Sequence, residues 1–344
     1  MEIKQEFRRI TIIAHGGASN RFYSKEQREL KLATVIGAVL EGAEVIQKEL
    51  EALPTVETVI KFMENSGNLN SGAGSVKQQD GKQRMDASIM GSDLRFGGVV
   101  QLEGFAHPIA VARKILEKRY DVLQESQKSE ELPDHILFEN NSAQKIAESH
   151  QISKMDTWKQ PSLPADLQSF LEEKIGLENL DRKSSEDYPE DELDTVGCVV
   201  LGYNGDLCAG TSTGGRGQCL PGRIGDSPLI GAGTYCNKKC GVSMTGFGEN
   251  IAQLCCAKRI VDQVYFDQIP VQVALEKTLR EYEDHFDTSV GSIAIDNEGE
   301  FAVGMNAVGM SWAAISFLLN VDGIVFERKL FYGTLKNEKH EITF

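Results

Sequence analysis

Two apolar stretches joined by a short polar turn constrain the fold of this 344-residue chain more than any other feature. Residues 195–201 and 207–213 are rich in small and β-branched side chains, and Tyr203-Asn-Gly-Asp206 lies between them. An Asn-Gly pair between two such stretches is typical of a β-hairpin. Because the first residue of one antiparallel strand lies beside the last residue of the next, we expect Thr195 and Thr213 to be neighbours.

Thr195 also marks an abrupt change in composition. Residues 185–194 are polar and acidic, whereas an apolar run containing glycine follows. A threonine becomes a self-sufficient nucleophile if the peptide bond before it is cut. Its new α-amino group then has a pKa of roughly 7.7–8.0 and can take the proton of the hydroxyl. The bond between Asp194 and Thr195 is therefore a candidate cleavage site.

The rest of the chain mixes strands and helices, which indicates an α+β fold with two stacked sheets covered by helices. Further strands are expected at 9–14, 84–90, 97–102, 291–296 and 301–306, the first running into a tight turn at His15-Gly-Gly-Ala18. Helices are expected at 26–50, 55–65, 108–119, 249–265 and 271–286. Between 120 and 194 only 143–147 and 167–174 have helical patterns, and we expect the last part to be disordered.

Composition excludes several functional classes. A net charge of -15 opposes binding to nucleic acid or anionic lipid. The longest apolar run, residues 310–321, is too short to cross a membrane, and because no apolar segment precedes the first strand we expect no secretory signal. The seven cysteines form no Cys-x-x-Cys pair, which favours reduced thiols and a cytoplasmic protein.

Three glycine-containing segments carry the other chemically useful residues. Thr213 lies in Thr211-Ser-Thr-Gly-Gly215. In Gly222-Arg-Ile-Gly-Asp-Ser-Pro228, the arginine can bind a carboxylate and the aspartate an ammonium group, which suits a zwitterion. Met244-Thr-Gly-Phe-Gly-Glu249 offers backbone N–H groups before a helix, which can stabilise an oxyanion. Each segment alone also fits an ordinary turn, a surface ion pair or a weak phosphate site, so residue patterns leave an enzyme and a small-molecule binder open.

The order and spacing of these motifs closely resemble the threonine-dependent N-terminal nucleophile hydrolases of the plant-type asparaginase family. The run from Asp194 to Tyr235 carries most of the likeness. Further support comes from His15-Gly-Gly-Ala18, Asn70-Ser-Gly-Ala-Gly74, Met85-Asp-Ala-Ser-Ile-Met90 and Asn306-Ala-Val-Gly-Met310. The likeness covers most of the chain outside about 120–190.

The resemblance implies one domain, residues 1–344, with a four-layer αββα sandwich. Cleavage before Thr195 would give an α chain, 1–194, and a β chain, 195–344. The α chain would end in a flexible acidic linker at about 120–194. The usual assembly of the family is a dimer of αβ units.

The resemblance also implies a role for each site residue. Thr195 would attack the substrate amide, Thr213 would bond to its hydroxyl, and Thr245 with Gly246 would form the oxyanion hole. The residues implied to hold the substrate are Arg223, Asp226, Gly246, Gly248 and Asn70. No cofactor is implied beyond a sodium ion held by backbone carbonyls of the loop from Met63 to Ala73.

The activity implied is hydrolysis of L-asparagine to L-aspartate and ammonia, cleavage of β-aspartyl dipeptides, or both. Two alternatives stay open. Leu193-Asp-Thr-Val-Gly197 and the polar linker are similar to threonine aspartase, a site-specific endopeptidase. Departures from the family pattern, such as Ser19 and Gly91, also allow an uncleaved, non-enzymatic homologue. Arg216, Lys238 and Lys239 are expected to add positive charge near the mouth of the site.

Overall fold

The computed structural model describes residues 8–20, 23–119, 134–158, 164–177, 195–319 and 325–343. Its helices are α1 Lys25–Glu49, α2 Ala52–Ser66, α3 Pro108–Leu116, α4 Asn140–Ser149, α5 Ala165–Phe170, α6 Gly248–Leu254, α7 Cys256–Phe266 and α8 Val271–His285. The strands are β1 Arg8–Ser19, β2 Met85–Gly91, β3 Phe96–Leu102, β4 Leu137–Glu139, β5 Val196–Leu201, β6 Leu207–Thr213, β7 Thr234–Cys236, β8 Cys240–Gly246, β9 Val290–Asp296, β10 Phe301–Met305, β11 Gly309–Leu319, β12 Val325–Leu335 and β13 His340–Thr343.

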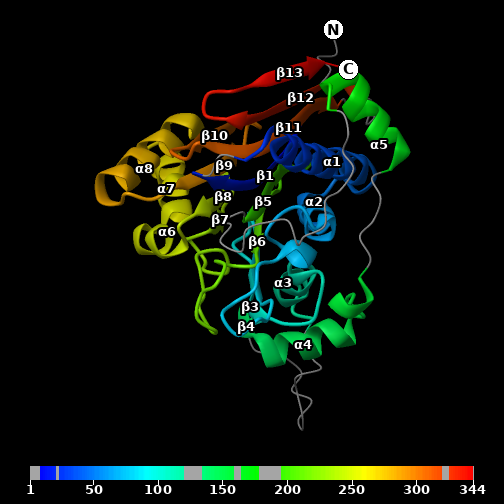
Figure 1. Ribbon diagram of the computed structural model, residues 1–344. Coiled ribbons are helices and arrows are strands. Elements are labelled where there is room, and N and C mark those ends of the chain that lie inside the picture. Colours follow the sequence, from blue (N-terminus) through cyan, green and yellow to red (C-terminus); the bar gives the residue numbers. More distant parts are fainter. Residues whose placement is uncertain are drawn as a thin grey trace.

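These strands form two sheets, both rich in antiparallel pairs. The larger has nine strands in the order β13-β12-β11-β1-β5-β6-β2-β3-β4, and the smaller has four in the order β10-β9-β8-β7. In Figure 1 the strands lie between α1 to α3 on one side and α6 to α8 on the other. The fold is therefore α+β, as predicted.

Alternating side chains along the strands explain how the two sheets stack. On β1, Ile12 packs with α1 and α2, whereas Ile13 packs between the sheets. On β9, Ile293 joins the core between the sheets, and Ala294 joins a third core beneath α7 and α8. Because successive side chains of a strand point to opposite faces, each central strand contributes to two cores.

The predicted hairpin forms in the predicted register. Val196 on β5 lies opposite Ser212 on β6, and the pairing continues to Leu201 opposite Leu207. The turn at 202–206 is closed by the Gly202 N–H, which donates to the Asp206 carbonyl at 2.8 Å. The end of β6 is therefore held beside Thr195, the residue before β5.

Two expectations about local structure were wrong, and two long strands were missed. The His15-Gly-Gly-Ala18 segment is no tight turn: β1 continues to Ser19, with an irregularity in its pairing to β11 between His15 and Ala18. The helix expected at 249–265 is two helices, because Cys255 has a left-handed φ of +50° that ends α6. The long strands β11 and β12 were not predicted: residues 310–321 entered the sequence analysis only as an apolar run too short to cross a membrane, and residues 325–335 were not interpreted.

The structure describes residues 134–158 and 164–177 of the segment between 120 and 194. Helix α4 covers the predicted pattern at 143–147, and α5 together with a π-helical turn, Leu171–Ile175, covers the one at 167–174. The predicted disorder at the end of the segment, and Asp194 itself, lie outside the described residues. Among the helices of the described ranges, none is long and apolar enough to cross a membrane. All seven cysteines are free.

Candidate active site

The two threonines predicted to be neighbours are bonded to each other. The Thr195 hydroxyl donates to Thr213 Oγ1 at 3.1 Å, and both residues are buried. Thr213 Oγ1 also accepts the Gly215 N–H at 3.0 Å. These two bonds fix the Thr213 hydroxyl oxygen, and with it the direction of the Thr195 side chain.

Asn70 lies on the other side of the same turn. Its Nδ2 donates to the Gly215 carbonyl at 2.7 Å, and its own carbonyl accepts the Gly214 N–H at 2.9 Å. Its Oδ1 accepts the Val76 N–H at 3.0 Å. The loop after α2 is therefore tied to the end of β6, which brings Asn70 close to the threonine pair.

The small sheet brings Thr245 toward the same place. A Cβ on Gly241 of β8 would lie 2.8 Å from Val199 of β5, and a Cβ on Gly197 would overlap the Ser243 side chain. Val199 thus lies opposite Gly241, and Gly197, two residues nearer to Thr195, lies opposite Ser243, two residues nearer to Thr245. Continuing by two more residues on each strand brings Thr195 and Thr245 to the same end of the stacked sheets. Thr245 is fully buried, and its Oγ1 accepts the Ala18 N–H at 3.2 Å.

The backbone conformation at position 246 requires a glycine. Its φ is +137°, and a Cβ there would overlap the carbonyl oxygen of Ser289. Neither the conformation nor the space suits an L side chain. The oxyanion-hole candidate therefore has a backbone N–H that any other residue would displace.

We expect Gly246→Ala to lower the free energy of unfolding by about 3 kcal/mol or more, because strain and backbone overlap add. Gly81→Ala is the matched control: Gly81 also has a positive φ, +78°, but its Cβ would meet nothing within 4 Å. That change should cost only about 1 kcal/mol. Both changes are measured by urea denaturation in the uncleaved Thr195→Ala chain, and equal losses would show that packing at Ser289 is irrelevant.

Arg223 has a partner that the sequence analysis did not anticipate. Its Nε and Nη2 donate to the two carboxylate oxygens of Glu249 at 2.9 and 2.8 Å. This bidentate ion pair lowers the pKa of Glu249. Glu249 directly follows Gly248 in the glycine segment, so its position in the motif was the signal that could have identified it.

Asp226 is buried at 4% exposure and lacks a full set of partners. Its Oδ2 accepts no hydrogen bond from the described residues. Burial raises the pKa of its carboxyl to about 7. A Cβ on Gly248 would lie 2.8 Å from Asp226 Oδ1 and 2.9 Å from Arg223 Nη2, so the glycine leaves the space over both groups open.

Gln101 holds the loop that carries Arg223. Its Nε2 donates to the Arg223 carbonyl at 2.8 Å, and its Oε1 accepts the Gly222 N–H at 3.2 Å. Its φ of +56° is unusual for a side chain of this size. The neighbouring Asp86 is fully buried opposite Thr213, and burial raises its pKa to about 6. Neither residue was predicted as part of the site.

His15 lies behind the threonines rather than in a turn. Its Nε2 is 3.0 Å from Ser243 Oγ, which in turn bonds Thr211 at 2.7 Å. Complete burial lowers the pKa of His15 to about 3, so the ring is neutral. The histidine therefore belongs to a polar network between the sheets.

Lys238 and Lys239 do not lie near the site, contrary to expectation. They occupy the turn between β7 and β8, whereas Gly246 ends β8 at its far end. The six steps of about 3.4 Å between the first and last residues of β8 separate its two ends by roughly 20 Å. Arg216, in contrast, lies beside Phe247, with its guanidinium carbon 5.2 Å from the ring centroid.

The candidate site is identified by its residues and not by a large cavity. Two surface cavities of about 400 and 450 Å³ lie along α8, one toward β10 and the other toward α7. Neither is lined by a residue of the predicted site. The structure instead brings together Thr195, Thr213 and Asn70, and separately Arg223, Asp226 and Gly248.

The comparisons with known proteins agree with this arrangement. A protein-family model described as asparaginase matches residues 8–318. The chain belongs to the asparaginase family. The plant-type L-asparaginase of Pyrococcus furiosus is 36% identical over 312 residues, 88% of this chain and 95% of the relative.

Two further relatives of this asparaginase-family chain carry the name isoaspartyl peptidase. The isoaspartyl peptidase/L-asparaginase of Bos taurus is 30% identical, over 89% of this chain and 92% of its own length. The isoaspartyl peptidase of Salmonella typhimurium is also 30% identical, over 87% and 93%. The aligned region thus spans nearly the whole of both relatives.

Proposed function

We propose that this asparaginase-family protein is a self-processing amidohydrolase that hydrolyses L-asparagine, cleaves β-aspartyl dipeptides, or does both. Its relatives are named for these two activities. The observation that carries the proposal for this chain is the hydrogen bond between Thr195 and Thr213 at the start of β5. A buried hydroxyl held in this way, directly after an acidic segment, is suited to become an N-terminal nucleophile.

Thr195 performs both the bond-making and the proton transfer in this proposal. Once the bond to Asp194 is cut, its α-amino group takes the hydroxyl proton as Oγ1 attacks the side-chain carbonyl carbon of the substrate. The Thr245 hydroxyl and the Gly246 N–H stabilise the oxyanion. The C–N bond then breaks, the leaving nitrogen takes the proton from the amino group, and water hydrolyses the remaining ester.

The substrate is held by charge. Arg223 binds the α-carboxylate, and Asp226 accepts hydrogen bonds from the α-ammonium group, with Gly248 leaving room for it and Asn70 near the scissile bond. The unpaired Oδ2 of Asp226 supports this role, because a buried carboxylate oxygen without a donor is suited to an incoming cation. Glu249 keeps the guanidinium of Arg223 in place through two of its N–H groups.

The wider organisation follows from the same proposal. The two sheets and their outer helices would be the four-layer αββα sandwich of one domain, residues 1–344, cut into chains 1–194 and 195–344. Segment 120–194 would be the linker that ends the first chain. We further propose a cytoplasmic dimer of αβ units.

A sodium ion in the loop from Met63 to Ala73 is a further proposal. Backbone carbonyls are suitable ligands for a hard cation. The loop folds tightly: a Cβ on Gly74 would overlap the Leu69 carbonyl oxygen and lie 3.0 Å from that of Gly67. The crowding of carbonyl oxygens supports the fit, and the ion would stiffen the loop that carries Asn70.

Intact mass spectrometry combined with an ammonia assay tests the proposed function. The purified protein should separate into two chains that meet between residues 194 and 195, and the processed sample should release ammonia from L-asparagine or leucine from β-aspartyl-leucine. A chain that stays whole and turns over neither substrate would contradict the proposal. Processing accompanied only by cleavage of proteins would favour the endopeptidase alternative.

The pH dependence should reveal Asp226. Because its pKa is raised to about 7 and only the carboxylate attracts the substrate ammonium, kcat/KM for L-asparagine below pH 7 should fall by a further tenfold or so per pH unit beyond the fall in kcat. The α-amino group of Thr195 titrates at roughly 7.7–8.0 and affects both kcat and kcat/KM. A titration near pH 7 that appears in the pH profile of kcat/KM but not in that of kcat therefore identifies Asp226. If the profile of kcat/KM shows no such titration, the assignment is contradicted.

A further inference from the structure

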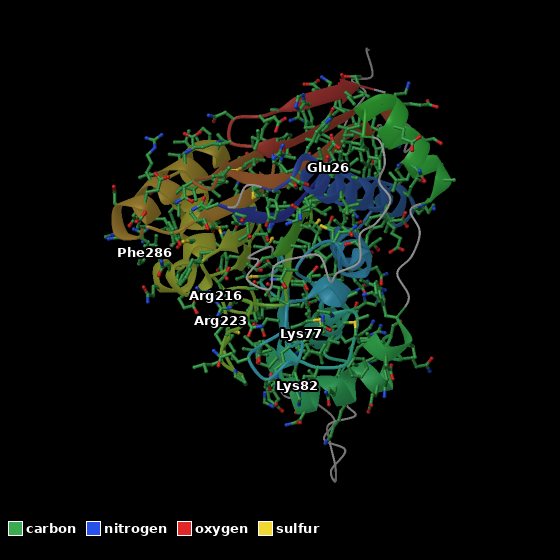
Figure 2. All side chains as sticks on the ribbon, viewed as in Figure 1. Glu26, Lys77, Lys82, Arg216, Arg223 and Phe286 are labelled. Atoms are coloured by element: carbon green, nitrogen blue, oxygen red, sulfur yellow. The ribbon has the colours of Figure 1, made fainter. Side chains whose placement is uncertain are left out.

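Arg216 is a cation at the site that the proposed chemistry does not use. Among the described residues its guanidinium forms no ion pair and no side-chain hydrogen bond, and it lies over the Phe247 ring at 5.2 Å. Phe247 separates Gly246 from Gly248. Figure 2 labels Arg216 close to Arg223, in the region below α6. The exposed guanidinium is thus placed at the edge of the substrate site and is available to an anion.

The backbone that carries Arg216 is held firmly. The preceding Gly215 donates to the Thr213 hydroxyl and accepts from Asn70. The Arg216 carbonyl accepts the Cys219 N–H at 3.3 Å. The loop is also tied to a neighbouring one, since Gln218 N–H donates to the Lys77 carbonyl at 3.0 Å. Arg216 therefore directly follows Gly215, whose N–H is bonded to the Thr213 hydroxyl.

The two arginines at the site differ in what they can still bind. Arg223 gives two N–H groups to Glu249 and has a side chain only 16% exposed. Arg216 is exposed and retains its donors for a ligand. The pKa of Glu249 is lowered by the hydrogen bonds from Arg223 and, to a smaller degree, by the charge of Arg216. The site can thus bind a second anionic group besides the α-carboxylate.

The two substrate types of the proposed function differ in such a group. L-Asparagine releases ammonia, which carries no carboxylate, whereas a β-aspartyl dipeptide releases an amino acid with its own carboxylate. We propose that Arg216 binds this leaving-group carboxylate, so that the protein prefers β-aspartyl dipeptides with a free C-terminus to L-asparagine. The inference rests on the proposed function, and Arg216 neither gives nor takes a proton.

The overall charge of the protein cannot account for a preference for anionic substrates. The chain has a net charge of -15, so its long-range field repels an anionic dipeptide. A preference for the carboxylate must therefore come from a cation within hydrogen-bonding reach. A guanidinium offers the fork of donors that matches a carboxylate.

The test compares three substrates: β-aspartyl-leucine, β-aspartyl-leucine amide and L-asparagine. Arg216→Met keeps a long side chain over Phe247 but removes the charge, and Arg216→Lys keeps the charge but removes the fork. Lys239→Met is the matched control, because Lys239 is an exposed cation in the turn at the far end of β8. Processing is verified by intact mass before each measurement.

We expect the ratio of kcat/KM for the free acid to that for the amide to fall about tenfold in Arg216→Met, the loss of one charge-assisted contact at a partly exposed site. The ratio in Arg216→Lys should lie between those of Arg216→Met and the wild type, and the ratio in Lys239→Met should equal that of the wild type. The inference is overturned if the wild type hydrolyses all three substrates and the ratio does not respond to residue 216. A wild type that processes and hydrolyses none of them would instead overturn the proposed function, and the inference with it.

If Arg216→Met does not fold, Arg216→Gln serves as the second neutral variant, with the same expected ratio. Ionic strength supplies a further readout that a purely structural role would not move. Salt also screens the repulsion by the whole chain, which is nearly the same in wild type and variants. Rising salt should therefore lower the ratio of kcat/KM for the free acid to that for the amide in the wild type relative to the same ratio in the neutral variants. An equal salt response in wild type and variants would contradict the carboxylate contact.

Discussion

Thr195→Ala should remain a single chain of about 37.9 kDa and release no ammonia from L-asparagine. The variant lacks the hydroxyl that is bonded to Thr213, so nothing attacks the preceding carbonyl during processing or the substrate carbonyl afterwards. Loss of a nucleophile reduces turnover by several orders of magnitude, and we expect a loss of at least about 10⁴-fold. Intact mass and an ammonia assay measure the two consequences on one sample.

Thr195→Ser is the matched control for this prediction. It keeps a hydroxyl and loses only the methyl group, so it should still process, although more slowly. Thr213→Ala should slow processing less than Thr195→Ala does, because it removes a hydrogen-bond partner and leaves the nucleophile. Ammonia release by a purified Thr195→Ala chain at the wild-type rate would disprove the assignment of the nucleophile.

The second large effect is expected for Asp226→Asn. The change keeps the shape of the side chain but removes the charge that attracts the substrate ammonium. Breaking one buried charge pair costs about 3–5 kcal/mol, so kcat/KM for L-asparagine should fall by about 150- to 4,000-fold, mainly through a higher KM. Processing should be largely retained, because the hydrogen bonds of Thr195 and Thr213 do not include Asp226. Equal losses of turnover and processing would indicate a structural role instead.

The same substitution should make the protein more stable at alkaline pH. Burial raises the pKa of Asp226 from 3.8 to about 7, so the protonated carboxyl is favoured in the fold. This stabilisation is present below pH 3.8 and is lost as pH rises through 7. At about 1.4 kcal/mol per pH unit, the wild type loses ~4 kcal/mol that the neutral asparagine does not lose.

Urea denaturation at pH 4 and pH 8 measures this difference in the Thr195→Ala background, which keeps one chain. Asp226→Asn should have little effect at pH 4 and a marked stabilising effect at pH 8. A gain in stability together with a loss of substrate binding would mark Asp226 as a residue retained for function. The opposite sign at pH 8 would mean that its carboxylate is well solvated.

Local pattern was sufficient to predict the core of the candidate site. The Asn-Gly turn sets the register of β5 and β6, and that register alone places Thr195 beside Thr213. The charges of Arg223 and Asp226 likewise indicated a zwitterion before any family was considered. In both cases the deciding residues are close in sequence, so short-range geometry determines their relation.

Other features depend on residues far apart in the chain. Glu249 is 26 positions from Arg223, and no local pattern pairs them. The break at Cys255 is a single left-handed residue inside a segment with helical periodicity. His15 continues a strand because β5 and β11 pair with it on both sides. Tertiary pairing overrode the local preference of two glycines for a turn.

The order of strands in the large sheet bears on what happens after the proposed cut. Strand β1 lies between β11 and β5, and β2 lies beside β6, so strands from before residue 194 alternate with strands from after it. Figure 1 shows the blue strand β1 enclosed by later segments. Two chains interleaved in this way cannot part without dismantling the sheet.

Folding and cutting must therefore occur in that order, and the order is difficult to reverse. The precursor folds as one chain, whereas the denatured mature protein has to find its partner chain by diffusion, which makes refolding depend on concentration. The mature form would persist through a high barrier to unfolding rather than through reversible equilibrium. The covalent link between the two halves would thus guide folding only in the precursor, and this guidance is lost when the linker is cut.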